Sequence, residues 1–275
     1  MPFENSPSAS VIMGVRYQRK DLALLERAVQ SILSQTFSDF EFLICQNGST
    51  PEAIVMLKNF CEEDPRISLI DGSGTNTLAQ KLNRCISQAR GRWIVRMDDD
   101  DYSEPERLEK QIAYLCEHLE IAFVGCFVRL VQDGTDVSER RLPENPSVKD
   151  FLFTQPFIHP ALVFRKEVLD AVGGYCEAPY CDGCEDYDLL LRLYEHGFVG
   201  TNLKQAYLVY TLPPRRTGNR TFSMRLHEMH TRFVRFHSLG LLPGALPFVI
   251  KPVLVGLIPA ALLSDFQMYR RKRKL

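Results

Sequence analysis

The stretch Gly91-Arg92-Trp93-Ile94-Val95-Arg96-Met97-Asp98-Asp99-Asp100-Asp101 joins an apolar run directly to four consecutive carboxylates. The run 93–97 is short and partly β-branched, which is typical of a buried strand. In an open α/β sheet, ligands bind at the carboxyl ends of the strands. Four carboxylates at that edge repel one another unless a cation lies among them, and hard divalent cations prefer carboxylate oxygens together with substrate phosphates. The stretch therefore predicts a metal site that holds a phosphorylated ligand.

Two simpler interpretations of these acids compete with a metal site. One is a solvated acidic turn, and it is the better interpretation of four acids considered alone. The other is a calcium loop, because Asp98, Asp100 and Glu109 occupy the first, third and twelfth positions of an EF-hand. Tyr102 and Ser103 stand where such a loop needs a ligand and a glycine, and a strand precedes it, so the calcium loop is rejected.

Composition places the chain among ordinary globular proteins. Its 275 residues can bury one large core, or a core with an appendage, and 45% of them are hydrophobic. The formal net charge of −1 argues against a nucleic-acid partner. Eight cysteines are scattered without an amino-terminal signal peptide, which indicates reduced thiols in a cytosolic protein.

Apolar patterning predicts strands that alternate with helices. The expected strands are 10–15, 40–45, 66–70 and 93–97, and the expected helices between them are 24–33, 51–62 and 78–90. Asp21 is the expected cap of the first helix, and Gly91 the expected stop of the third. Beyond the acids we expect a helix over 105–116, strands over 121–131 and 161–164, and a polar segment from Asp133 to about Asp150. This alternation predicts an α/β fold with a Rossmann-like, mostly parallel sheet flanked by helices.

A second acidic pair, Glu185 and Asp186, stands at the start of a predicted helix that ends near Gly197. Acids are common at helix N-termini because the helix dipole favours them there. The alternative is that one of the two is a general base.

Six segments of the chain match sequence motifs of one enzyme family, in the order in which that family has them. They are Ser10-Val11-Ile12-Met13-Gly14-Val15, Ser31-Ile32-Leu33-Ser34-Gln35-Thr36-Phe37, Arg96-Met97-Asp98-Asp99-Asp100-Asp101, Pro105-Glu106-Arg107-Leu108-Glu109-Lys110-Gln111, His159-Pro160 and Cys184-Glu185-Asp186-Tyr187-Asp188-Leu189-Leu190-Leu191-Arg192-Leu193. Together they resemble the family-2 glycosyltransferases, which are inverting enzymes with the GT-A fold. The resemblance covers most of the chain, from about Ser10 to Tyr210.

The resemblance implies roles for the acids. Asp98 and Asp100 would form an Asp-x-Asp pair in which Asp100 takes Mn²⁺ or Mg²⁺ and Asp98 takes the ribose or a metal-bound water. Asp101 is the alternative metal ligand if the register differs by one. Asp186 would be the general base that deprotonates the acceptor hydroxyl, with Glu185 as a positioning residue or second candidate.

Donor binding is expected from residues at the ends of the first strands and near the acids. The nucleotide-binding residues so implied are Val15, Arg16, Gln46, Asn47, Lys81, Asp98 and Asp99. The family often has two acids where this chain has Gln46-Asn47, and a Tyr-Asn where it has Arg16-Tyr17-Gln18. These departures leave the donor open. Lys81 is interpreted either as a solvated helix residue or as a contact of the donor diphosphate.

Other positions have two interpretations each. His159 and Cys184 are expected on the acceptor side, although a structural role for His159 is slightly favoured. Arg216 and Arg220 lie in a basic segment that is either a loop closing over the diphosphate or a plain linker. Cys176, Cys181 and Cys184, with His159 or His196, could bind zinc, but packing of a loop over the acceptor cleft is the preferred interpretation.

The carboxyl-terminal part differs from the rest. We expect a loose lead-in over 1–9, a GT-A domain over 10–214, and a helical hydrophobic appendage over 215–275. The apolar stretch 241–263 contains four prolines and Lys251, which disfavour a single transmembrane helix. Peripheral membrane contact through 241–275, with the basic tail on anionic headgroups, is preferred. The alternative is an arm packed on the catalytic domain or on a second subunit of a homo-oligomer.

These observations predict an enzyme. We expect a metal-dependent, inverting glycosyltransferase at the cytoplasmic face of the cell membrane. It would move a hexosyl or N-acetylhexosaminyl group from a nucleotide sugar, with UDP as the expected nucleotide, to a glycan or lipid-linked acceptor in bacterial surface-polysaccharide assembly. A non-catalytic sugar-nucleotide or glycan-binding module is the alternative. A nucleotidyltransferase is disfavoured because Gly14-Val15-Arg16-Tyr17-Gln18 lacks a glycine-rich phosphate loop.

Overall fold

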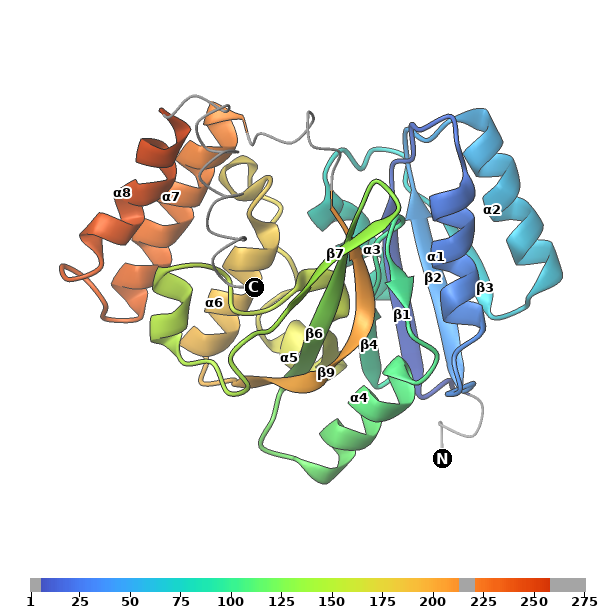
Figure 1. The fold of residues 1–275 in the computed structure, drawn as a ribbon, viewed down its shortest axis with the longest axis horizontal. Coiled ribbons are helices and arrows are strands. Elements are labelled where there is room, and N and C mark those ends of the chain that lie inside the picture. The colour runs from blue at the N-terminus through green and yellow to red at the C-terminus, as the bar shows by residue number, and fades with distance from the viewer. Residues whose placement is uncertain (1–5, 213–220, 258–275) are drawn as a thin grey trace.

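A sheet with helices on both faces forms the centre of the molecule (Figure 1). The structure is a computed structural model that describes residues 6–212 and 221–257. Its strands are β1 (Ala9–Val15), β2 (Phe40–Gln46), β3 (Ile67–Asp71), β4 (Trp93–Arg96), β5 (Tyr102–Ser103), β6 (Phe123–Gln132), β7 (Thr135–Arg140), β8 (Val163–Arg165) and β9 (Gly200–Thr211). Its helices are α1 (Ala23–Leu33), α2 (Pro51–Glu63), α3 (Leu78–Gln88), α4 (Arg107–Glu117), η1 (Val148–Leu152), η2 (His159–Ala161), α5 (Lys166–Ala171), η3 (Pro179–Cys181), α6 (Glu185–Glu195), α7 (Phe222–Ser238) and α8 (Leu246–Gly256).

The strand order is β3-β2-β1-β4-β8-β6-β9-β5, and β7 pairs with β6. The first four strands are parallel, in a register that places Val15 beside Gln46 and Gln46 beside Asp71. Their carboxyl ends therefore share the edge from which the acidic segment leaves β4. The second half is mixed, because β8 is antiparallel to β4 and β6, whereas β6 and β9 are parallel. The predicted α/β class is confirmed, with a parallel half and a mixed half.

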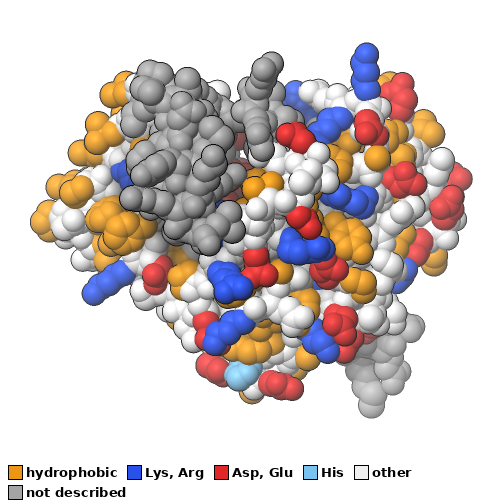
Figure 2. All heavy atoms as spheres, in the orientation of Figure 1, with side chains coloured by type: hydrophobic (Ala, Val, Ile, Leu, Met, Phe, Trp, Pro, Cys, Tyr) orange, Lys and Arg blue, Asp and Glu red, His pale blue; other side chains and the backbone are white. Residues whose placement is uncertain are grey.

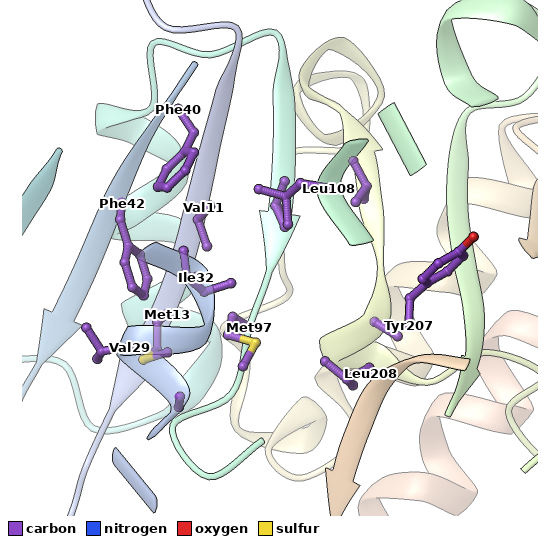
Figure 3. Packing of buried hydrophobic residues seen from close by; sticks show 14 of the residues in the cluster. Val11, Met13, Val29, Ile32, Phe40, Phe42, Met97, Leu108, Tyr207 and Leu208 are labelled. Carbon is purple, nitrogen blue, oxygen red and sulfur yellow. The ribbon is translucent and has the colours of Figure 1, made fainter. Parts of the chain in front are cut away.

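Alternation along β1 distributes its side chains between two hydrophobic cores. Val11 and Met13 face the core beneath α1, α2 and α4, whereas Ile12 faces the core beneath α3, α5 and α6. Figure 3 shows part of the first core, where side chains of β1 and β2 meet Val29 and Ile32 of α1. Both faces of β1, β2 and β4 are buried, which explains why these strands are nearly continuous apolar runs, whereas β3 at the edge of the sheet is partly exposed.

β7 and β5 lie in segments where no strand was predicted. β7 occupies part of the segment that was expected to be irregular, and it pairs along one side with β6. Its residues are mostly exposed, so its sequence has no apolar alternation that would have revealed it. β5 is only two residues long, and it pairs antiparallel with β9 directly after the acids.

Two predicted helix boundaries were also wrong. α3 ends at Gln88 with Ala89 as its cap, so Gly91 does not stop the helix. Instead, Gly91 packs against the backbone of β1, where a Cβ atom would lie 2.4 Å from the carbonyl carbon of Ala9. At α1, Leu22 is the N-cap, although Asp21 still accepts a hydrogen bond from the backbone nitrogen of Ala23 at 2.9 Å.

α7 and α8 lie at the end of the molecule opposite α2 (Figure 1). α7 packs on α6 and η3, α8 packs on α7, and Phe236, Ala245 and Val249 join the second hydrophobic core. Part of the predicted appendage is thus packed on the rest of the protein, as the alternative interpretation expected. None of the helices in the described part of the chain has the length and apolar character needed to cross a bilayer. The basic tail, Arg216 and Arg220 lie outside the described residues.

Candidate active site

A cavity of about 590 Å³ lies between the acidic segment after β4 and the start of α6. Asp98 lines it from the first of these elements, and Glu185 and Asp186 line it from the second. His159 and residues of α7 and α8 complete its walls. The structure therefore brings the two acidic groups of the sequence, about 90 positions apart, to one cavity.

Basic side chains hold the acidic segment. Arg96, whose side chain is fully buried, forms an ion pair with Asp98. Arg19 donates to Asp100 Oδ2 at 2.8 Å, and Arg27 donates to the backbone oxygen of Asp100 at 3.0 Å. Asp101 is buried and accepts a hydrogen bond from the backbone nitrogen of Thr211 at 2.8 Å, which ties the segment to the end of β9.

The Ser31-to-Phe37 and Pro105-to-Gln111 segments form a buried hydrogen-bond scaffold behind these acids. Gln35 accepts from the backbone nitrogen of Leu108 at 3.0 Å and donates to the carbonyl oxygen of Glu104 at 2.8 Å. Arg107 donates to the carbonyl oxygens of Arg96 (2.7 Å) and Pro160 (2.8 Å). These contacts fix the loop after β4 against α1, α4 and the His159-Pro160 turn.

Burial and mutual repulsion perturb the acids. Burial, reinforced by Asp98 and Asp100, raises the pKa of Asp99 to about 7. Burial and the charge of Asp98 also raise the pKa of Asp100 and raise that of Asp101 well above its ordinary value. In the isolated chain, the basic residues nearby therefore do not fully offset the negative charge of the segment.

The chemistry of these residues suits a hard divalent cation, although in the described chain no three of them bring carboxylate oxygens within 4.8 Å of one another. Asp101 Oδ2 is buried, and among the described residues it has no hydrogen-bond partner. The donor set consists of carboxylate oxygens only, which suits Mg²⁺ or Mn²⁺ better than softer metals. A cation here would favour the ionised carboxylates and so oppose the burial and the mutual repulsion that raise the pKa values of Asp99, Asp100 and Asp101.

Glu185 and Asp186 open α6, where the helix dipole favours negative charge. Gln155 donates to Asp186 Oδ2 at 3.1 Å, and the backbone nitrogen of Tyr187 donates to Asp186 Oδ1 at 2.7 Å. Burial, followed by the charge of Asp186, raises the pKa of Glu185 to about 7. The two neighbouring carboxylates therefore differ in environment.

α7 holds the loop that precedes these acids. Gly183 has a φ of +79°, and a Cβ atom there would lie 2.2 Å from Cε of Met224. His227 Nδ1 lies 3.0 Å from the carbonyl oxygen of Asp182, and Cys184 Sγ lies 3.3 Å from Thr231 Oγ1. Cys184, predicted on the acceptor side, is thus the N-cap of α6 and a packing contact of α7.

The residues predicted to bind the nucleotide lie at the carboxyl ends of β1, β2 and β4 and on α3. Asn47 donates to the carbonyl oxygen of Thr75 at 2.6 Å, which fixes the loop after β2. Gln46 Oε1 is buried with no hydrogen-bond partner in the described part of the chain. Lys81 is only 3% exposed, and burial, together with the charge of Arg16, lowers its pKa.

His159 lines the cavity, and its Nε2 lies 2.7 Å from the hydroxyl of Tyr175. Burial, with the charge of Arg96, holds its pKa well below the usual range, so the imidazole is neutral at ordinary pH. This contact agrees with the structural role that the sequence slightly favoured. It leaves the acceptor contact as a prediction.

The side chains considered for a zinc site do not come together as predicted. Cys176 and Cys181 lie together, but in the described residues their third neighbour is Asp188 rather than Cys184 or a histidine. Both carboxylate oxygens of Asp188 accept hydrogen bonds from arginines, Arg192 and Arg235, at 2.8 Å.

Several cavity residues were missed by the sequence analysis. They are Gln155, Tyr210 and Arg140, which come from a loop, β9 and β7. Tyr210 is close enough to both acidic groups for Asp98 and Asp186, after burial, to raise its pKa. Their local sequences carry no motif, so only the tertiary fold reveals them.

The comparisons agree with this geometry. Residues 10–173 match the family model described as Glycosyl transferase family 2. The chain is 30% identical over 270 residues to EpsE of Bacillus subtilis, which is named as a glycosyltransferase, and the match covers 98% of this chain and 95% of EpsE. It is 36% identical over 188 residues to the O-antigen biosynthesis glycosyltransferase WbnJ of Escherichia coli, covering 67% of this chain and 70% of WbnJ.

Solved structures share the fold. TarS 1–349 of S. aureus, in complex with UDP-GlcNAc, superimposes with a TM-score of 0.70 at 17% identity, covering 89% of this chain and 73% of TarS. The mannosyltransferase PcManGT of Pyrobaculum calidifontis, in complex with GDP-Man and Mn²⁺, gives a TM-score of 0.61 at 18% identity, covering 97% of this chain and 81% of PcManGT.

Proposed function

The chain belongs to glycosyl transferase family 2, and on that premise we propose that it transfers a sugar from a UDP-sugar to an acceptor hydroxyl, with metal assistance and inversion at the anomeric carbon. That the chain is a glycosyltransferase follows from its family. The nucleotide, the metal, the stereochemistry and the residue roles belong to the proposal.

The observation that carries the proposal is the shared cavity of Asp98 and Asp186. An inverting transfer by single displacement needs the leaving group and the attacking hydroxyl on opposite sides of one carbon. The cavity offers Asp98 of the acidic segment on one side and Asp186 on the other; Asp100 and Asp101 follow Asp98 in the chain but do not line the cavity. Its volume of about 590 Å³ is in the range of small-molecule sites.

The donor side consists of the carboxyl ends of β1, β2 and β4. We assign Asp100 as the metal ligand, with Asp101 as the alternative, and Asp98 to the ribose or a metal-bound water. When bound, Mn²⁺ or Mg²⁺ would supply positive charge to the leaving diphosphate. The Mn²⁺ in the PcManGT complex supports a divalent cation at this fold.

Nucleotide recognition is assigned to the β1–β2 edge. Buried Gln46 Oε1 is a hydrogen-bond acceptor that a base N–H could satisfy, although the family's acid is replaced there. Lys81 and Arg16 supply positive charge for the diphosphate, and burial keeps Lys81 in place. The UDP and UDP-GlcNAc complexes of TarS support a uridine nucleotide.

Asp186 carries the base role in the chemical step. Its carboxylate takes the proton of the acceptor hydroxyl as that oxygen bonds to the anomeric carbon and the bond to the diphosphate breaks. Gln155, which donates to Asp186 Oδ2, orients the carboxylate. Glu185 stands beside it as the positioning residue or the second candidate.

The acceptor side is assigned to the part of the cavity beyond Asp186. Arg140, Glu228, Arg232 and Lys251 line it, and such polar side chains suit the hydroxyls of a glycan or the charges of a lipid-linked glycan. The name of WbnJ, an O-antigen biosynthesis enzyme, supports an acceptor of the surface-polysaccharide class.

The test is a panel of nucleotide sugars with purified full-length protein and Mn²⁺, in which released nucleoside diphosphate is measured with and without chelator. Release from a UDP-sugar that stops on chelation is the expected result. Nucleotide binding with no turnover, even when membrane extract supplies acceptors, would favour the binding-module alternative. Metal-independent release would refute the metal assignment.

A further inference from the structure

The outward sides of α7 and α8 form an exposed apolar surface, which we call the α7–α8 face. It consists of Phe222, Leu226, Phe233, Leu246, Ile250, Leu254 and Leu257. Figure 2 shows hydrophobic side chains gathered along the edge of the molecule that α7 and α8 occupy in Figure 1. Leu254 is 56% exposed and Leu257 69% exposed, so these side chains project well out of the protein.

Helical spacing shows that this face is organised. Leu246, Ile250, Leu254 and Leu257 recur at steps of four, four and three, which places them on one side of α8. The other side of α8 is buried through Val249 and Pro252. Of thirteen large hydrophobic side chains that are exposed in the described residues, seven belong to these two helices and an eighth, Leu257, is the C-cap of α8. Scattered apolar residues are ordinary on a surface, but a concentrated apolar face indicates a binding surface.

The charge of this part of the chain identifies the chemistry of its partner. From Phe222 to the last residue the sequence contains nine Lys or Arg and two Asp or Glu, a formal charge of +7, whereas the whole chain has −1. Five of these cations follow one another from Arg270 to Lys274. An apolar helical face in a segment whose sequence is strongly basic complements a lipid surface that carries anionic headgroups.

We propose that the α7–α8 face docks the protein on an anionic lipid surface. A second copy of the chain fits this face less well, because a two-fold contact places the same segment of both copies together. Two segments of charge +7 would then repel each other. α8 presents one side to the protein through Val249 and Pro252 and the other, through Ile250 and Leu254, to its surroundings.

Docking through the α7–α8 face would also bring the cavity close to the lipid surface. Met224 and Arg225 of α7 and Pro252 and Val255 of α8 line its wall, so the helices that carry the apolar face also build the acceptor side. This step rests on the proposed function: the acceptor is then a glycan anchored in the same lipid surface, which reaches Asp186 past α7 and α8.

Vesicle co-sedimentation of the full-length protein tests the docking. We expect it to sediment with vesicles of phosphatidylglycerol and phosphatidylcholine but not with phosphatidylcholine alone, and to be released as salt screens the charges. The double variant Ile250→Gln/Leu254→Gln should bind at least roughly tenfold more weakly, because its apolar contact with the bilayer is lost. Val55→Gln/Leu119→Gln makes the same change at exposed positions elsewhere and should bind like the natural protein.

Equal binding by Ile250→Gln/Leu254→Gln and the natural protein, or no binding to anionic vesicles, would overturn the proposal. So would a dimer in light scattering that the Ile250→Gln/Leu254→Gln variant converts to monomer, since a second copy would then cover the face. Unchanged melting temperatures of both double variants exclude misfolding. The assay contains no sugar donor, and Asp186→Asn should sediment like the natural protein, so failure of docking and failure of the proposed function are distinguishable.

Discussion

Glu185 and Asp186 are adjacent in the sequence but differ in their contacts. Asp186 accepts hydrogen bonds from Gln155 and from the backbone nitrogen of Tyr187, and such bonds stabilise a carboxylate. Burial raises the pKa of Glu185 to about 7. A general base works best when its pKa lies near the working pH, so Glu185 stays the second candidate, and the assignment of Asp186 rests on the family resemblance and on the fixed orientation of its carboxylate.

The raised pKa of Glu185 gives a pH-dependent stability. Between the ordinary pKa of a glutamate and about 7, the Glu185 carboxyl is protonated in the folded protein but ionised in the unfolded chain. The contribution of Glu185 to the free energy of unfolding therefore falls as the pH rises through that window. The variant Glu185→Gln has no titrating carboxyl at this position, so this fall in stability with pH is absent from it. The melting temperature of the variant relative to the natural protein should therefore increase from pH 5 to pH 8, by about 5–10 °C. Glu62→Gln, on the exposed side of α2, should show no such trend.

Gln35 should matter for stability although it contacts no substrate. Gln35→Ala leaves the nitrogen of Leu108 and the oxygen of Glu104 unpaired in a buried scaffold, so the free energy of unfolding should fall by about 2–4 kcal/mol. Gln30→Ala, at an exposed position of α1, should change it by less than about 0.5 kcal/mol. Chemical denaturation measures both, and equal effects would contradict the scaffold role.

At the scale of elements, the loop before α6 depends on α7. In the variant Gly183→Ala, an alanine must adopt the positive φ of Gly183, and its Cβ atom must displace the side chain of Met224, which lines the cavity. Gly173 is a matched control, since its φ is +73° and a Cβ there meets nothing within 4 Å. Both variants should lose about 1–2 kcal/mol of stability through backbone strain, but only Gly183→Ala should also reduce sugar transfer. Equal rates of sugar transfer by Gly183→Ala and Gly173→Ala would show that moving the Met224 side chain does not affect the reaction.

Helices and strands with a strong apolar period were predicted well, because burial imposes that period on the sequence. α1, α2 and β6 each lie within a few residues of their predicted bounds. β7 was missed because it is polar and exposed, and Gly91 was misinterpreted because its role is a close approach to β1, a strand far away in the sequence. Local sequence carries no signal for either.

The site was predictable only where it is encoded locally. Asp98 and the Glu185-Asp186 pair stand out as acids at element ends. The Gln155–Asp186 hydrogen bond and the position of Tyr210 depend on long-range packing of β9 and of the loop after η1. The roles of Gln35 and Arg107 as a scaffold were also invisible, since motif resemblance does not separate a binding residue from a structural one.

At the scale of the whole molecule, the cavity lies between the parallel half of the sheet and the α6–α8 helices. A nucleoside diphosphate bound with a cation at the acidic segment should stabilise the folded state by about 2.7 kcal/mol at a hundredfold excess over its Kd. UDP with Mn²⁺ should therefore raise the melting temperature by several degrees. Asp100→Asn should abolish the part of the shift that needs Mn²⁺, and a full shift in this variant would make Asp101 the metal ligand.

The measurement that tests the central claim most directly is the rate of sugar transfer by the variant Asp186→Asn. UDP binding is measured on the same protein. The control is Asp170→Asn, which changes an exposed carboxylate of α5. The account predicts a loss of roughly 10²–10⁴-fold in the rate for Asp186→Asn, unchanged UDP binding, and full activity for the control. Transfer at the natural rate by Asp186→Asn would contradict the base assignment and the catalytic role of the cavity that Asp98 and Asp186 share.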